Sequence, residues 1–128
     1  MPRLLVIDDD PIICQISRAY FTSKGYDVTT AMDGVEGLNK WKSEEYDLVI
    51  TDLMMPNRHG YEVIDMIKLS ARGAKTPVIL LTADKSEPEL EKYDRRQFQD
   101  DTLTKPFDMP MLEKMIKDLL AEFADREG

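Results

Sequence analysis

The chain has 128 residues, 42% of them apolar and 33% charged, which fits one globular domain spanning 1–128 rather than a disordered or fibrous protein. Its formal net charge of −8 argues against direct binding to nucleic acid or to a membrane surface. Cys14 is the only cysteine and no apolar run reaches the roughly 20 residues of a membrane span, so an internal disulfide is excluded and the reducing cytoplasm is the expected location.

Short apolar runs alternate with longer amphipathic stretches along the whole chain. The runs predict strands at 4–7, 26–31, 48–50, 78–81 and 102–104. The first, third and fourth runs are unbroken, as is typical of parallel strands that are covered on both faces. We therefore expect an α/β protein with a parallel sheet, whose successive strands are joined by helices on both of its faces.

The first two joining helices have clear start signals. Asp10 can cap the first helix with Pro11 at its first position, and Gly25 lies where that helix would end. Asp33 and Glu36 resemble a capping box that opens the second helix.

The later helices differ in the strength of their patterns. The third should end at Gly73 and the fifth should follow a cap at Asp108, whereas the fourth, at 86–97, has few apolar residues and is expected to pack loosely. Cys14 is expected in or near the core. The expected apolar faces consist of Ile13, Ile16 and Tyr20; of Val35, Leu38 and Trp41; of Val63, Ile64, Ile67 and Ala71; and of Leu112, Met115, Ile116, Leu119 and Phe123.

Polar residues follow the predicted strands at their carboxyl ends, where open parallel sheets bind ligands. Asp8 and Asp9 follow the first strand and Asp52 the third. Thr82 ends the fourth, and Lys105 follows the fifth. Crowded carboxylates repel one another unless a cation neutralises them, and all-oxygen ligands favour Mg²⁺, Mn²⁺ or Ca²⁺. A cation beside a lysine and a threonine also suits a phosphoryl group, despite the acidity of the site.

Four motifs stand in order at these strand ends. They are VIDDDP at 6–11, DLMMP at 52–56 followed by Gly60, LTAD at 81–84 and TKPF at 104–107. Over nearly the whole chain their order and spacing resemble the receiver domain of two-component response regulators. The resemblance implies a flavodoxin-like fold, doubly wound, with five parallel strands in the order 2-1-3-4-5.

The resemblance also implies a metal site. Asp9 and Asp52 would ligate Mg²⁺ directly, together with the backbone carbonyl of Met54, and Asp8 would act through a metal-bound water. Mn²⁺ is the alternative ion, and no other cofactor is expected.

The phosphorylation chemistry implied by the resemblance centres on Asp52. This carboxylate would attack a phosphoryl group carried on a histidine of a partner, and an ionised carboxylate needs no general base. Thr82 would bond a phosphoryl oxygen once Asp52 is modified. Lys105 would pair with Asp52 before modification and with the phosphoryl group afterwards. The Lys105–Pro106 peptide bond is expected to be cis, as it is in the family.

One segment departs from the family pattern. Receivers usually carry Tyr or Phe three residues before the lysine, and this aromatic side chain swings inward on activation. Thr102 occupies that position here, and Phe98 and Gln99 replace the usual Gly-Ala pair. We hypothesise that Asp52 is still phosphorylated but signals through a modified readout, with Phe98 as a candidate for the missing aromatic bulk.

The expected function is that of a phosphoacceptor switch rather than an enzyme, one that assists its own phosphorylation and dephosphorylation. Its donor would be a sensor histidine kinase or a histidine phosphotransfer domain that docks near the first helix, and it would act on a downstream partner through the fourth and fifth helices. Two alternatives stay open: a degenerate receiver that serves as a constitutive docking module, and an Mg²⁺-dependent aspartyl phosphohydrolase. The expected oligomeric state is a monomer or a phosphorylation-dependent dimer. The chain would be either a single-domain regulator or a receiver from a longer protein.

Overall fold

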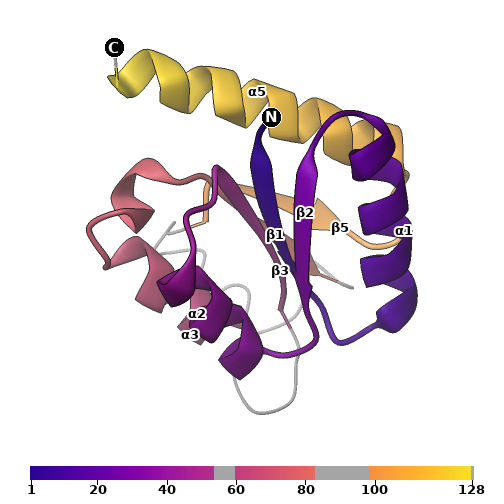
Figure 1. Ribbon diagram of the computed structural model, residues 1–128, viewed down its shortest axis with the longest axis horizontal. Coiled ribbons are helices and arrows are strands. Elements are labelled where there is room, and N and C mark those ends of the chain that lie inside the picture. The colour runs from indigo at the N-terminus through magenta and orange to yellow at the C-terminus, as the bar shows by residue number, and fades with distance from the viewer. Residues whose placement is uncertain (54–59, 83–98, 128) are drawn as a thin grey trace.

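The computed structural model describes residues 1–53, 60–82 and 99–127 of the chain. Five parallel strands form one sheet in the order β2-β1-β3-β4-β5 (Figure 1). The strands are β1 (Arg3–Ile7), β2 (Asp27–Ala31), β3 (Leu48–Asp52), β4 (Val78–Thr82) and β5 (Asp101–Thr104). The helices are α1 (Pro11–Ser23), α2 (Gly34–Ser43), α3 (Gly60–Lys68), the 3-10 turn η1 (Gly73–Lys75) and α5 (Met109–Glu127). The predicted parallel α/β fold and its strand order are confirmed.

Helices cover both faces of the sheet: α1 and α5 lie on one side, and α2 and α3 on the other (Figure 1). Alternate residues of each strand supply the two cores. In β1, Leu4 and Val6 face the α1–α5 side, whereas Leu5 and Ile7 face the α2–α3 side. All five residues of β3, at the centre of the sheet, are buried. Within the described ranges, no helix is both long enough and apolar enough to cross a membrane.

The helix starts follow the predicted caps. The side chain of Asp10 accepts a hydrogen bond from the Ile12 amide and that of Asp33 accepts one from the Glu36 amide. Asp108 accepts a bond from the Met111 amide at the start of α5. After α1 the chain turns at Gly25, whose φ of 92° is a conformation that side chains disfavour.

One predicted apolar face is displaced, and another is correct except for one residue. On α1, Ile16 is 46% exposed, and the buried row consists of Cys14, Ser17 and Phe21, one position further along. Small side chains at the first two of these positions let the helix lie close to the sheet, so that Cys14 Sγ reaches the Asp8 carbonyl oxygen at 3.3 Å. On α2, Val35 is 43% exposed, whereas Leu38 and Trp41 are buried as predicted. Period alone does not distinguish a helix face that meets the sheet from its neighbour.

The end of α3 also differs from the prediction. The helix stops at Lys68, so Ala71 lies outside it and is exposed. Ser70 is the cause: its hydroxyl donates to the Ile67 carbonyl and accepts from the Gly73 amide, which replaces the helical pattern by a turn. Gly73 therefore belongs to the turn after the helix. The expected helix at 86–97 lies outside the described residues, as do Met54, Asp84 and Phe98.

Candidate functional site

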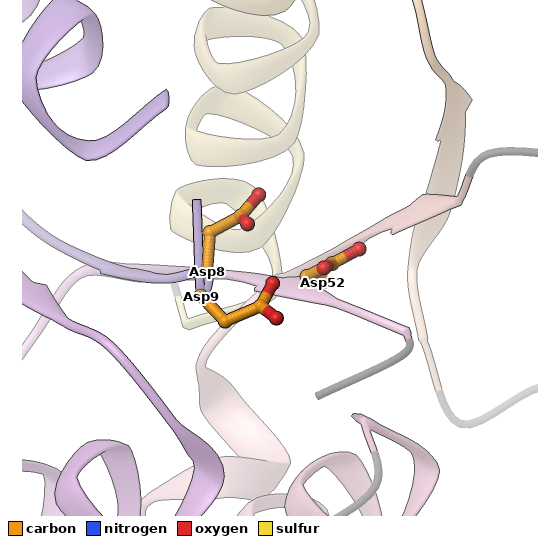
Figure 2. Close-up of side chains that lie close together, drawn as sticks. All are labelled: Asp8, Asp9 and Asp52. Carbon is orange, nitrogen blue, oxygen red and sulfur yellow. The ribbon is translucent and has the colours of Figure 1, made fainter. Parts of the chain in front are cut away.

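Three carboxylates gather where the neighbouring strands β1 and β3 end. Asp8 and Asp9 directly follow β1, and Asp52 is the last residue of β3, whose Thr51 pairs with Ile7 of β1. Figure 2 shows the three side chains side by side, and one oxygen of each lies within 4.8 Å of the others. Asp8 is completely buried and Asp52 is 7% exposed, whereas Asp9 is open to solvent. The predicted acidic cluster therefore exists, with two of its members taken out of water.

Lys105 adds one positive charge to this cluster. Its Nζ lies 3.0 Å from Asp8 Oδ2 and 3.5 Å from Asp52 Oδ1, so its shorter contact is to Asp8 rather than to the expected Asp52. The Lys105 amide donates to the Thr82 carbonyl at 2.7 Å, which holds the ends of β4 and β5 together. The Lys105–Pro106 peptide bond is cis, as expected.

Backbone amides hold the two buried carboxylates in place. Asp52 Oδ1 accepts a hydrogen bond of 2.9 Å from the Leu53 amide, and Asp8 Oδ1 accepts one of the same length from the Asp10 amide. Each carboxylate keeps further lone pairs for a cation or for Lys105. The arrangement is thus organised before any ligand arrives.

Burial and crowded negative charge both raise the pKa values of the buried carboxylates. Burial is the larger cause for Asp52; together with the nearby Asp8 carboxylate, and against the opposing charge of Lys105, it raises the pKa of Asp52 to about 7. Burial also raises the pKa of Asp8. Burial disfavours the charged form of Lys105, but its hydrogen bond to Asp8 and the two carboxylate charges outweigh this and raise its pKa. One ammonium therefore does not neutralise three carboxylates, and a divalent cation would complete the charge balance.

The donor set fits a hard cation. The cluster offers carboxylate oxygens, with neither histidine nor cysteine among its members, and such ligands suit Mg²⁺ or Mn²⁺. Asp9 and Asp52 each bring a carboxylate oxygen to this cluster, and their direct coordination of the ion stays a prediction. The carbonyl of Met54, which the family resemblance adds, falls outside the described residues.

Thr82 reaches the same edge of the sheet. It is the last residue of β4, is fully buried, and follows Leu81, which pairs with Asp52. The five predicted site residues that the structure describes therefore gather at one edge of the sheet. They are Asp8, Asp9, Asp52, Thr82 and Lys105. Thr102 lies on β5 opposite Leu80 and is partly exposed.

Gly60 is a site residue whose importance the sequence motif alone does not explain. It begins α3, and its amide donates to the Leu53 carbonyl at 2.8 Å. A Cβ atom at this position would overlap the Asp52 carbonyl oxygen and come within 2.8 Å of Leu53 Cα. Only glycine lets α3 begin this close to the end of β3.

Gly60→Ala is accordingly expected to displace the backbone that carries Asp52, to lower the stability by about 2 kcal/mol or more, and to weaken Mg²⁺ binding. Thermal melting and calorimetric titration with Mg²⁺ measure the two effects. Gly25→Ala is the control, because a Cβ there meets no atom within 4 Å and the cost of the change comes from the positive φ alone. Loss of stability in Gly25→Ala without loss of Mg²⁺ binding would separate backbone strain from damage to the site. Unchanged Mg²⁺ binding in Gly60→Ala would contradict this role.

Sheet order, helix layers and the acidic rim together define a flavodoxin-like α/β protein with its polar site at the carboxyl ends of the strands. The family model described as response regulator receiver domain matches residues 4–117. The chain belongs to this family, and the predicted membership is confirmed.

The curated relatives are named as regulatory proteins, several of them as transcriptional regulators. The chain is 36% identical over 121 residues to the DNA-binding dual master transcriptional regulator RpaA of Synechocystis sp., covering 94% of this chain and 49% of the relative. It is 34% identical to the regulatory protein VanRB of Enterococcus faecalis, covering 92% of this chain and 52% of the relative. The chain thus spans about half the length of the curated relatives it matches. Because one relative is named as DNA-binding, the expectation of no direct nucleic-acid binding gains no support from them.

Solved structures share the fold over nearly the full chain. The chemotaxis response regulator CheY4 of Vibrio cholerae superimposes with a TM-score of 0.85 at 29% identity, covering 93% of this chain and 98% of that one. The response regulator TrrA of Thermotoga maritima, solved in complex with Mg²⁺ and BeF, has a TM-score of 0.80 at 34% identity, covering 93% and 99%. Receiver domains are phosphoacceptor switches that bind Mg²⁺ at an acidic pocket and pair with histidine kinases.

Proposed function

We propose that Asp52 accepts a phosphoryl group from a phosphohistidine of a partner kinase or phosphotransfer domain, and that this modification changes the surface offered to a downstream partner. The observation that carries the proposal is the placement of Asp52: a nearly buried carboxylate, beside Asp8 and Asp9, with the ammonium of Lys105 at 3.5 Å. Residues 1–128 would act as one receiver module, in the cytoplasm, as a monomer or a phosphorylation-dependent dimer.

In the proposed reaction an Asp52 carboxylate oxygen forms a bond to phosphorus while the bond from phosphorus to the donor imidazole nitrogen breaks. The Leu53 amide fixes the Asp52 carboxylate, and Lys105 offers its charge to the phosphoryl oxygens as they leave the donor. Thr82 would donate its hydroxyl to one of these oxygens. Asp9, Asp52 and the Met54 carbonyl would hold Mg²⁺ directly and Asp8 through water. The bound ion would stabilise the negative charge of the transferring group.

The same residues would assist the reverse of the switch. The product is an acyl phosphate, which water hydrolyses, so the modified state is temporary. The chain would therefore promote its own phosphorylation and dephosphorylation without acting on a separate substrate.

Intact-mass measurement after incubation with acetyl phosphate tests the proposal. With Mg²⁺ present, the wild-type protein should gain one phosphoryl group, and with a chelator in place of Mg²⁺ it should gain none. No gain from either acetyl phosphate or a phosphohistidine donor would instead favour the degenerate receiver, whose support is Thr102 at the usual aromatic position. Turnover of a small phosphomonoester would favour the phosphohydrolase.

An apolar groove beside the site suits the docking partner. Ile13 and Ile16 of α1 line one side of it, and Lys105, Phe107 and Met109 line the other. Because Lys105 belongs to both the groove and the acidic cluster, a partner seated in the groove would lie next to Asp52. We therefore place the phosphohistidine donor on this face of α1.

Ile16→Asp is expected to slow phosphoryl transfer from a phosphorylated histidine phosphotransfer domain by about tenfold or more, because a charge would occupy the apolar contact. Transfer from acetyl phosphate should stay unchanged, since a small donor needs no docking surface. Val35→Asp on α2 is the control, because its side chain is 43% exposed and that of Ile16 is 46%. Equal slowing in both variants, or slowing with acetyl phosphate, would contradict the placement of the donor.

A further inference from the structure

Thr104 lies beside Thr82 at the end of the sheet, next to the site but without a role in the chemistry described above. The two residues are partners in the register between β4 and β5. The hydrogen bond from the Lys105 amide to the Thr82 carbonyl closes the same pair of strand ends at 2.7 Å. Their backbones are therefore fixed relative to each other.

The side chains of Thr82 and Thr104 point to the same face of the sheet. Their predecessors, Leu81 and Leu103, are also register partners, and both pack into the core beneath α1 and α5. Successive side chains of a strand alternate between faces. The two threonine side chains therefore project from the opposite face, side by side.

The Thr104 hydroxyl is buried and unpaired. Its Oγ1 is shielded from solvent and has no hydrogen-bond partner among the described residues. A buried hydroxyl without a partner destabilises the state in which it occurs, and native structures contain few such groups. A partner gained in another state of the protein would explain why this hydroxyl is retained.

We propose that Thr104 is a positioning residue for the phosphorylated state: its hydroxyl donates to Thr82 Oγ1 when Thr82 donates its own proton to the phosphoryl oxygen. This rests on the proposed function of Asp52. A hydroxyl has one proton to donate and two lone pairs that accept, so Thr82 can serve as the middle member of such a chain. Each bond in the chain polarises and strengthens the next.

In this proposal, hydroxyl groups and not an aromatic side chain couple phosphorylation of Asp52 to the conformation of the protein. Thr104 raises the energy of the unmodified state, in which its hydroxyl is unpaired, and lowers that of the modified state. It therefore biases the switch towards the modified conformation. In this chain, with Thr102 in place of the family aromatic residue, β5 would sense phosphorylation through its last threonine.

Three variants test the proposal, with beryllofluoride and Mg²⁺ as the phosphoryl probe in calorimetric titration and with thermal melting of the unmodified protein. Thr104→Val should bind the probe about five- to tenfold more weakly than the wild type, and its unmodified form should melt about 2–5 °C higher. Thr104→Ser keeps the hydroxyl and should restore wild-type probe affinity. Thr102→Val is the matched control, because it makes the same change two residues earlier on the same strand face.

Unchanged probe affinity in Thr104→Val would overturn the role of Thr104 while leaving phosphorylation of Asp52 intact. Equal weakening in Thr102→Val would also overturn it, because the effect would then belong to the strand face as a whole. A lower melting temperature of unmodified Thr104→Val would show that the hydroxyl is already paired. Failure of the wild type itself to bind the probe or to gain a phosphoryl group would remove the proposed function, and Thr104's role with it.

Discussion

Asp52→Asn is expected to abolish the gain of a phosphoryl group completely, from acetyl phosphate and from a phosphohistidine donor alike. The amide preserves the shape of the side chain but is not a nucleophile, so the variant lacks the carboxylate that ends β3 beside Lys105. Intact-mass measurement in the presence of Mg²⁺ gives the result directly.

Asp10→Asn is the matched control for that experiment. Asp10 belongs to the same acidic run, but its side chain caps α1, and asparagine caps a helix equally well. This variant should gain one phosphoryl group as the wild type does. A phosphoryl gain in Asp52→Asn, or a modified peptide that contains Asp8 or Asp9, would contradict the assignment.

Asp52→Asn should also change the pH dependence of stability when Mg²⁺ is absent. The folded protein raises the pKa of Asp52 from 3.8 to about 7, so the fold holds a proton that the unfolded chain releases. Ionisation of Asp52 therefore leaves the free energy of unfolding unchanged below pH 4. It lowers this free energy progressively as the pH rises towards 7, and above pH 7 the loss stays constant. The variant should gain on the order of 2–4 kcal/mol relative to the wild type across that interval, as measured by melting at pH 4.5 and pH 8 with a chelator.

Lys105→Met is expected to destabilise the Mg²⁺-free protein by about 3–5 kcal/mol at pH 8, because it leaves the completely buried carboxylate of Asp8 without its 3.0 Å partner. Without the ammonium, the pKa values of Asp8 and Asp52 rise further, and both groups take up protons at higher pH. The loss of stability should therefore shrink as the pH falls to 5, and added Mg²⁺ should also reduce it at pH 8. Denaturant unfolding at the two pH values measures the difference.

Lys114→Met provides the comparison for this second variant. Lys114 and Asp118 form an ion pair of 2.9 Å, but both side chains are mostly exposed, so its removal should have little effect at either pH. In the double variant Asp8→Asn/Lys105→Met, most of the lost stability should return, because the completely buried charge of Asp8 is removed together with its partner. Equal destabilisation by Lys105→Met at pH 5 and pH 8 would show that packing of the lysine stem, and not its charge, is responsible.

The sheet and the rim of the site were predictable because both follow from the order of residues along the chain. Unbroken apolar runs such as 48–50 mark strands that are buried on both faces, and parallel strands bring Asp8 and Asp52 to one edge wherever the helices lie. The packing of individual helices was not predictable in the same way. Ile16 and Ser17 are adjacent positions on one amphipathic helix, and only the approach of α1 to the sheet decides which is buried.

Two features of the site depend on contacts that a sequence pattern does not contain. The preference of Lys105 for Asp8 reflects distances of 3.0 and 3.5 Å that depend on the exact course of β5. The position of Thr104 opposite Thr82 depends on the register between β4 and β5. A shift of one residue in this register would turn the Thr104 side chain to the other face of the sheet. The hypotheses about Phe98 and the helix at 86–97 concern residues beyond the described ranges, and they stay predictions.

The central position of β3 has a consequence for how a signal leaves the site. β3 is paired on both sides, with β1 and β4, and all five of its residues are buried. Asp52 therefore belongs to the strand of the sheet that is most resistant to displacement. β5, which carries Thr104 and leads into Lys105, borders the sheet and is paired to β4 alone among the described strands. The proposed phosphorylation would thus modify a residue on the most firmly held strand, and we expect the resulting displacement in β5, which pairs with a single neighbour among the described strands.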